Sequence, residues 1–218
     1  MKRLLYIGAT LVLLFAPALS RAQNLAFQTN LLDWANFGTA NISMSTSVGR
    51  RVTLGINAEY NPWTFHTKET WVYNRHRTFG VWGEWWPWYV NAGWSVKFGL
   101  QQKEYAMGGI SVFKHDYGER FGRIPLVEEG DAWGAGVALK YTRLLARNWN
   151  MEFGVGVWGG KKFYTRYRCP NCGRRLEQGS TWFVAPYDIS VGIVYVIPFG
   201  EGFKRQREEA VQVPYRMR

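Results

Sequence analysis

Two cysteines in one short turn are the residues whose types and spacing most clearly indicate chemistry in this chain. They stand in the motif Cys169-Pro170-Asn171-Cys172-Gly173, which is half of a zinc knuckle, a turn that directs two thiolates at one metal ion. A structural zinc site needs two further ligands, and the sequence contains no other cysteine. The histidines His66, His76 and His115 are the remaining candidates, so a metal site is one interpretation of the motif.

A disulfide between Cys169 and Cys172 is the interpretation that we favour, because the N-terminal segment described below indicates export to an oxidising compartment. Free thiols are the third interpretation. We expect no cofactor.

Residues of a hydrolase triad also occur in the sequence. Ser111, His115, Asp116 and Glu119 supply the nucleophile, base and acid that such a triad needs. Their spacing specifies no geometry, and these residue types are common in any polar loop. We therefore expect a protein that is not an enzyme, with a lipid-modifying enzyme of the outer leaflet as the alternative.

Charged residues alternate with apolar ones along several segments, and the alternation places them on the inner side of a predicted barrel. Buried charges persist only when they are paired and hydrogen-bonded, so we expect salt bridges across the lumen that plug it. A charged lining is also typical of a narrow channel, which is the alternative. The predicted lumen charges are Glu59, Glu84, Lys97, Lys140 and Glu152, and Asp188 occupies an inward position of the last predicted strand.

The elements that would hold these residues are clearest between Thr39 and Tyr60. Residues 39–48 and 52–60 alternate large apolar with small polar side chains, and Gly49-Arg50-Arg51 separates the two runs. Strand side chains point to opposite faces with period two, so this segment is predicted to be an antiparallel hairpin. An eight-stranded barrel has room inside for small side chains, so the large apolar set is expected to face outward, toward lipid.

The same pattern predicts eight strands in all and hence an all-β, eight-stranded antiparallel up-and-down transmembrane β-barrel. Long loops are predicted at Asn61–His76, Ala106–Asp131 and Tyr164–Ser180, whereas the turns at the other end are short. This asymmetry is typical of outer-membrane barrels and places both mature termini in the periplasm. The predicted strands are about 24–32, 39–48, 52–60, 77–86, 93–105 and 132–141, one beginning at Trp149 and one ending at Ile197.

Residues 1–22 are predicted to be a cleaved signal peptide. Met1-Lys2-Arg3 is positively charged, Leu4 to Leu19 is largely apolar, and Ser20-Arg21-Ala22 offers small residues for cleavage. Residues 23–199 then form the barrel and residues 200–218 a charged periplasmic tail. Removal of the segment lowers the net charge from +11 to +8, and because an exported chain does not normally meet nucleic acid, we expect none as a partner.

The partners that we expect are outer-membrane lipids, lipopolysaccharide and the barrel-assembly machinery. Aromatic residues, which make up 17% of the chain, cluster toward both ends of the predicted strands, where amphipathic rings favour the membrane boundary. The basic residues between Lys161 and Arg175 either bind lipopolysaccharide phosphates or a protein, or only neutralise headgroups. Residues 190–197 resemble the signal by which the assembly machinery engages a final strand.

Several short motifs together resemble a domain-of-unknown-function family of small outer-membrane barrels from anaerobic Gram-negative bacteria, often found beside fimbrial genes. The resemblance supports the fold and the outer-membrane location, and it implies a link to surface fimbriae but no reaction. We therefore expect a structural, adhesion or surface-assembly role at the cell surface. The matching pieces are Thr29-Asn30-Leu31-Leu32, Tyr60-Asn61-Pro62-Trp63, Gly108-Gly109, Gly134-Ala135-Gly136, residues 148–152, residues 169–173 and Pro186.

Overall fold

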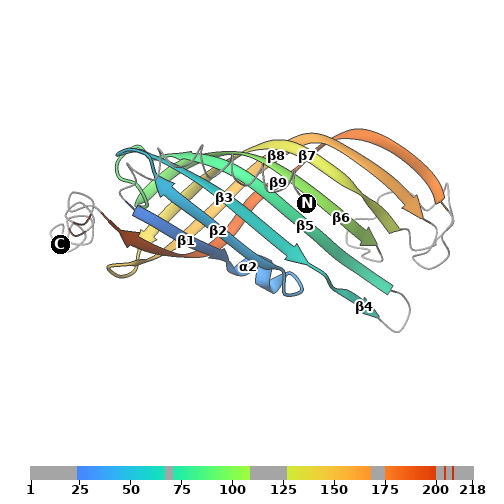
Figure 1. The fold of residues 1–218 in the computed structure, drawn as a ribbon, viewed down its shortest axis with the longest axis horizontal. Coiled ribbons are helices and arrows are strands. Elements are labelled where there is room, and N and C mark those ends of the chain that lie inside the picture. The colour runs from blue at the N-terminus through green and yellow to red at the C-terminus, as the bar shows by residue number, and fades with distance from the viewer. Residues whose placement is uncertain are drawn as a thin grey trace, which may run out of the picture.

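The computed structural model describes residues 24–66, 71–108, 127–167 and 175–199, together with Lys204 and Glu208. Between residues 24 and 199 the described chain is built from strands and one single-turn helix (Figure 1). Among the described residues no helix is long and apolar enough to cross a membrane. The elements are β1 (Asn24–Asn30), α2 (Leu31–Ala35), β2 (Ala40–Ser47), β3 (Val52–Asn61), β4 (Thr64–His66), β5 (Trp71–Trp85), β6 (Gly93–Gly108), β7 (Val127–Leu144), β8 (Trp149–Tyr167) and β9 (Arg175–Pro198).

Eight of the strands form a closed ring in which each strand pairs antiparallel with its neighbours in the sequence. The sheet runs β3-β2-β1-β9-β8-β7-β6-β5, and the pairing of β3 with β5 closes it, while β4 adds only to the end of β5. The predicted all-β class with eight antiparallel strands is confirmed. Closure satisfies the backbone groups that an open sheet would leave at its edges.

The strands are staggered around the ring, which requires them to tilt. A path that starts at Leu25 and steps from each residue to its partner on the next strand reaches β9 at Pro186. On its other side Leu25 pairs directly with Ile197 of β9, which lies eleven positions after Pro186. A closed sheet with a stagger of this kind has strands inclined by about 35–45° to its axis. The intermediate partners are Thr46, Leu54, Gly83, Phe98, Val137 and Val157.

Side chains alternate between the two faces of the ring as the sequence predicts. The hairpin of β2 and β3 is confirmed, with Ile42 and Met44 exposed outside and the adjacent Ser43 and Ser45 turned inward. On β8, Val155 and Val157 are likewise exposed, whereas Asn150 and Glu152 are buried. The exception is Thr46, which was expected outside but is buried and donates a hydrogen bond from Oγ1 to the Asn24 carbonyl, at 2.9 Å.

One end of the ring carries the short turns and the other carries longer connections. Turns at residues 48–51, 86–92 and 145–148 lie at the same end as Asn24 and Pro198, which pair with each other. At the opposite end, β5 to β9 continue well past α2 and form a one-sided extension of the ring, which we call the wall (Figure 1).

Strand ends are where the sequence-based prediction was wrong. β5 begins at Trp71, inside the predicted loop Asn61–His76, and β4 occupies part of the same stretch. β6 and β7 shorten the predicted loop Ala106–Asp131 from both sides, and β8 and β9 do the same to Tyr164–Ser180. The first strand stops at Asn30, whose side chain caps α2 by accepting a hydrogen bond from the Leu32 N–H.

Candidate functional site

The interior of the ring is the candidate site, and its turn end is closed by an apolar lid. The turn at residues 86–92 folds inward, so that Trp86 and Val90 are buried against Ala26 of β1 and Val196 of β9. The Trp86 indole Nε1 donates to Thr53 Oγ1 at 3.2 Å, which satisfies its one polar atom. Apolar side chains therefore fill the interior at the turn end.

A layer of buried ion pairs lies directly above the lid. Lys140 of β7 pairs with Glu152 of β8, and its Nζ is 3.4 Å from Asp188 Oδ2 of β9. Lys97 of β6 reaches the same Asp188 oxygen from the other side, at 2.5 Å. The side chain of Lys140 is completely buried, and Lys97, Lys140, Glu152 and Asp188 each have a partner of opposite sign, which is what burial of charges requires.

Neutral side chains donate hydrogen bonds to Glu84 and Glu152, the two glutamates of this layer. Ser95 Oγ donates to Glu84 Oε1 at 2.6 Å. Gln28 Nε2 donates to Glu152 Oε1 from β1, and Thr142 Oγ1 donates to the other oxygen at 3.5 Å. The ion-pair layer therefore ties β1, β5, β6, β7, β8 and β9 together across the ring.

A bulge in β9 delivers Asp188 to the ion-pair layer. The register against β8 shifts between Gly154 and Gly156, and Asp188 has a φ of 50°, a left-handed conformation that few residues other than glycine adopt. The extra residue lets both Tyr187 and Asp188 face the interior, where strict alternation would allow only one. The residue pattern alone carries no signal for this bulge.

Three aromatic rings form the next layer, which the volume argument from sequence did not predict. Trp82, Trp158 and Tyr187 are buried inside the ring, and the Lys97 ammonium lies 4.7 Å from the centre of the Trp82 ring. Space for them comes from glycines opposite: a Cβ at Gly136 would lie 2.8 Å from the Tyr187 ring. Large inward side chains are thus accommodated where the neighbouring strands carry glycine, which has no side chain.

A polar cavity of about 240 Å³ lies above the aromatic layer, beside α2. Along β6 the inward positions pass from Lys97 through Gly99 to Gln101 and Lys103, the last two of which line the cavity. Glu59, which the sequence assigns to the lumen charges, lines this cavity and is not one of the ion-paired residues of the layer below. The cavity can hold water or a small polar molecule.

Asp33 on α2 is the titratable group of the cavity that lies outside the strands. Burial, together with the negative charge of Glu59, raises the pKa of its carboxyl to about 6. The Asn30 amide, which donates to Asp33 Oδ2 at 2.9 Å, opposes the shift. Asp33 therefore changes charge near neutral pH.

The residues that suggested metal or hydrolytic chemistry fall largely outside the described part of the chain. Cys169, Cys172 and His115 lie there, as do Ser111, Asp116 and Glu119, so their predicted roles remain predictions. His66 ends β4, and His76 is buried on the inner face of β5. Within the described ranges no group of three or more His, Cys, Asp or Glu side chains could hold a metal ion.

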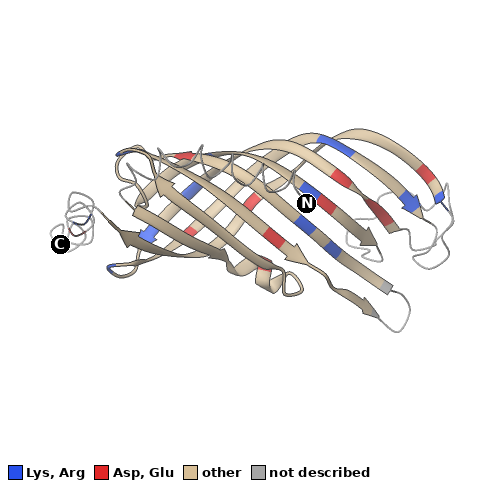
Figure 2. Cartoon of the chain, viewed as in Figure 1, with Lys and Arg blue, Asp and Glu red and all other residues tan. Residues whose placement is uncertain are grey.

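The basic residues from Lys161 to Arg166 lie on both faces of the wall. Lys161 is exposed on the outer face, whereas Lys162 and Arg166 turn inward and pair with Glu128 Oε1 and Oε2 at 2.8 and 3.0 Å. Arg166 also pairs with Glu177 of β9 at 2.8 Å. Figure 2 shows both acidic and basic positions toward the far ends of the long strands.

Comparisons with known proteins give a family and no activity. Residues 8–197 match the model of a family described as protein of unknown function, DUF3575. No curated protein matches the chain. No solved structure matches it either.

Proposed function

The chain belongs to the DUF3575 family, whose description supplies no function, and we propose from its structure that it is an integral outer-membrane β-barrel with a plugged lumen and a structural, adhesion or surface-assembly role. It is not an enzyme in this proposal. Lipids and lipopolysaccharide surround the ring, and the wall and loops meet partners outside the cell.

The apolar outer face of the ring is the observation that carries this proposal. Large apolar side chains are exposed on every strand of the ring except β1, with Phe98 and Leu100 more than half exposed, while charged side chains are buried inside. A water-soluble protein arranges these two classes the other way round. On β3 the outward run from Val52 to Tyr60 covers nine residues, which fits the about 9–11 that a tilted strand needs to cross a membrane.

Exposed aromatic residues at the two ends of the ring support the same orientation. Trp88, Trp94 and Trp149 lie near the turn end, and Trp63 and Trp133 lie toward the other end, each about half exposed. Amphipathic rings favour the boundary between lipid and water. The sequence-based expectation of a signal peptide over residues 1–22 agrees with export. The short turns at one end and the longer connections at the other favour a periplasmic turn end with both mature termini.

Three filled layers support a plug rather than a channel. The lid, the ion-pair layer and the aromatic layer follow one another across the interior, and the side chain of Lys140 has no exposure to solvent. An eight-stranded ring has space for little besides its own side chains. The role of the protein then lies at its surface, and the resemblance noted from the sequence makes fimbrial components candidate partners.

Cell fractionation with a folding assay tests the proposal. The full chain is expected in the outer-membrane fraction, to require detergent for extraction, and to migrate differently on gels when boiled, as closed membrane barrels do. Recovery of a folded monomer from detergent-free buffer would contradict it. Addition to planar bilayers is expected to give no conductance steps, and steps that the lid variant Trp86→Ala enlarges would indicate a channel instead.

A further inference from the structure

β9 has a long unpaired edge in the wall. β1 pairs with β9 only from Gly192 to Pro198, and the Asn30 side chain then takes over, accepting from the Val191 N–H and donating to the Ile189 carbonyl. From Arg175 to Asp188 the described residues offer β9 one neighbour, β8. Among the described residues no strand lies beside the backbone N–H and C=O groups on the other side of this segment, and Pro186, which has no N–H, ends the usable edge at Ala185. We call Arg175–Ala185 the β9 edge.

Most of the β9 edge, from Gln178 to Ala185, lacks the features that usually protect an open strand. No charged residue occurs from Gln178 to Ala185, and Thr181-Trp182-Phe183-Val184 are all residues that favour strands. Trp182 and Val184 are 78% and 81% exposed, more than any other large apolar side chain of the described residues. Natural proteins normally place lysine, proline or a short strand at such an edge, so an unprotected one indicates a partner.

The opposite border of the wall follows that rule. β4 is only three residues long, runs from Thr64 to His66, and is preceded by Pro62, which cannot extend the ladder. The two borders belong to one sheet, so the difference between them is not a general property of the wall.

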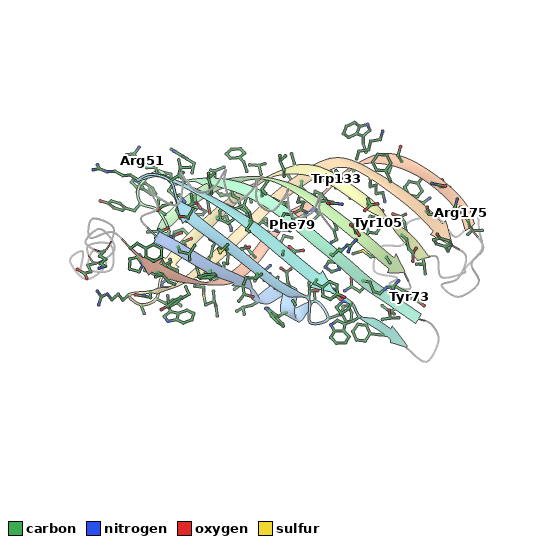
Figure 3. The ribbon with its side chains drawn as sticks, viewed as in Figure 1. Arg51, Tyr73, Phe79, Tyr105, Trp133 and Arg175 are labelled. Carbon is green, nitrogen blue, oxygen red and sulfur yellow. The ribbon has the colours of Figure 1, made fainter. Side chains whose placement is uncertain are left out.

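Ion pairs hold the wall in shape behind the β9 edge. Glu128 of β7 joins Lys162 and Arg166 of β8, and it accepts a hydrogen bond from the Tyr105 hydroxyl of β6 at 2.8 Å. Arg166 continues the network to Glu177 of β9 itself. Figure 3 places Tyr105 on this extension and Arg175 at its far end. A fixed edge loses little entropy when another strand pairs with it.

We propose that the β9 edge is a docking site for an extended segment of another surface protein, which adds one strand to the wall. Backbone hydrogen bonds provide the attachment, as in other cases of strand addition. Trp182 and Val184 select apolar side chains at alternate positions of the incoming strand, because those side chains stand beside them on the same face. This proposal specifies the partner chemistry of the surface role proposed above and rests on it.

A second copy of the chain in the same membrane does not fit the β9 edge. Two such copies are related by an axis along the membrane normal, so their tilted strands would cross at about twice the tilt, roughly 80°. Paired strands differ in direction by only about 20–25°. A free segment of another protein can instead align with the inclined edge.

Peptide binding to the detergent-solubilised full chain tests the proposal. The probe is a synthetic peptide of alternating valine and threonine with a short charged tail, labelled for fluorescence anisotropy. It is compared with the same peptide N-methylated at every second residue, which lacks the donors along one side. We expect the first peptide to bind and to slow amide exchange across Arg175–Ala185, and the N-methylated peptide to bind at least tenfold more weakly.

Two protein variants sharpen this test. Trp182→Lys with Val184→Lys places protective charges on the β9 edge, and we expect about tenfold weaker binding from the loss of two cross-strand pairs. Phe163→Lys is the matched control, since Phe163 is exposed on the same face of β8 but has strands on both sides, and it should bind as the unaltered chain does.

Equal binding of the two peptides, or binding that the double variant leaves unchanged, would overturn the docking site. A photo-crosslinker at position 182 that joins two copies of the chain in cells would overturn the choice of partner. If the peptide binds but the chain fractionates as a soluble protein, the membrane proposal fails and the strand-addition site stands.

Discussion

The closed ring and the wall are two parts of one sheet that satisfy the same backbone groups in different ways. In the ring every strand has two neighbours, and its interior charges are buried in pairs such as Lys140 with Glu152. In the wall the pairs are partly exposed and one border, the β9 edge, remains open. The comparison indicates that the ring provides stability and a seal, and that the wall provides a surface on which recognition can occur.

The largest effect is expected inside the ring, from Lys140→Met. Removal of this ammonium leaves Glu152 and Asp188 buried without their shared partner, which typically costs about 3–5 kcal/mol. Urea unfolding in detergent, followed by the gel shift of the folded form, measures it. The matched control is Lys161→Met in the wall, whose exposed side chain should contribute less than about 0.5 kcal/mol. Similar losses in the two variants would remove the distinction between ring and wall.

Crowding of the aromatic layer is the next effect in size. A methyl group at Gly99 would overlap the Tyr187 hydroxyl, so Gly99→Ala is expected to lower the free energy of unfolding by about 1–3 kcal/mol. Combination with Tyr187→Phe, which removes the overlapping oxygen, should restore more than half of that loss. Additive effects of the two substitutions would show that the two groups do not meet.

A smaller and more local effect is expected from Glu128→Gln in the wall. The substitution weakens the pairs with Lys162 and Arg166. Because Glu128 and Lys162 are partly exposed and the buried Arg166 keeps its pair with Glu177, the global change should stay below about 1 kcal/mol. Amide exchange should accelerate in the outer ends of β7 and β8 and remain unchanged near Lys140. Faster exchange throughout the ring would mean that the wall and the ring unfold as one unit.

The smallest effect is a pH dependence at α2. The pKa of Asp33 is raised to about 6 by burial and by Glu59, so the folded state holds its proton more tightly than the unfolded chain does. The stabilisation is complete below about pH 4 and is lost as pH rises through 6. Amide exchange in α2 should therefore be a few-fold slower at pH 4.5 than at pH 7.5 after correction for intrinsic rates. In Asp33→Asn this difference should disappear.

The ring could be predicted from sequence because lipid and interior impose opposite demands on alternate residues. Ile42 and Ser43 differ in polarity for that reason, and the same contrast identified Lys97 and Glu152 as inward. In the wall both faces carry polar residues, as Lys161 outside and Lys162 inside show, so the alternation disappears and strands were taken for loops.

Interior details depend on contacts between distant residues and could not be predicted. Alternation placed Asp188 inside, but the bulge that turns Tyr187 inward as well depends on the register against β8, and the place of Trp82 depends on Gly55 of the neighbouring strand β3. Alternation predicts one direction per residue and therefore does not reveal the bulge or the space for these rings. The open β9 edge likewise depends on where β1 stops, at Asn30, which is a property of the topology.

Site-directed spin labelling on β2 tests the central claim, the orientation of the two faces, most directly. Cysteines at Ile42, Ser43, Met44 and Ser45, introduced one at a time with Cys169 and Cys172 replaced by serine, carry a nitroxide in lipid vesicles. We expect labels at Ile42 and Met44 to be relaxed by oxygen dissolved in lipid and not by an aqueous nickel chelate, and labels at Ser43 and Ser45 not to contact lipid. Labels at all four positions that respond equally to the aqueous reagent would contradict the account.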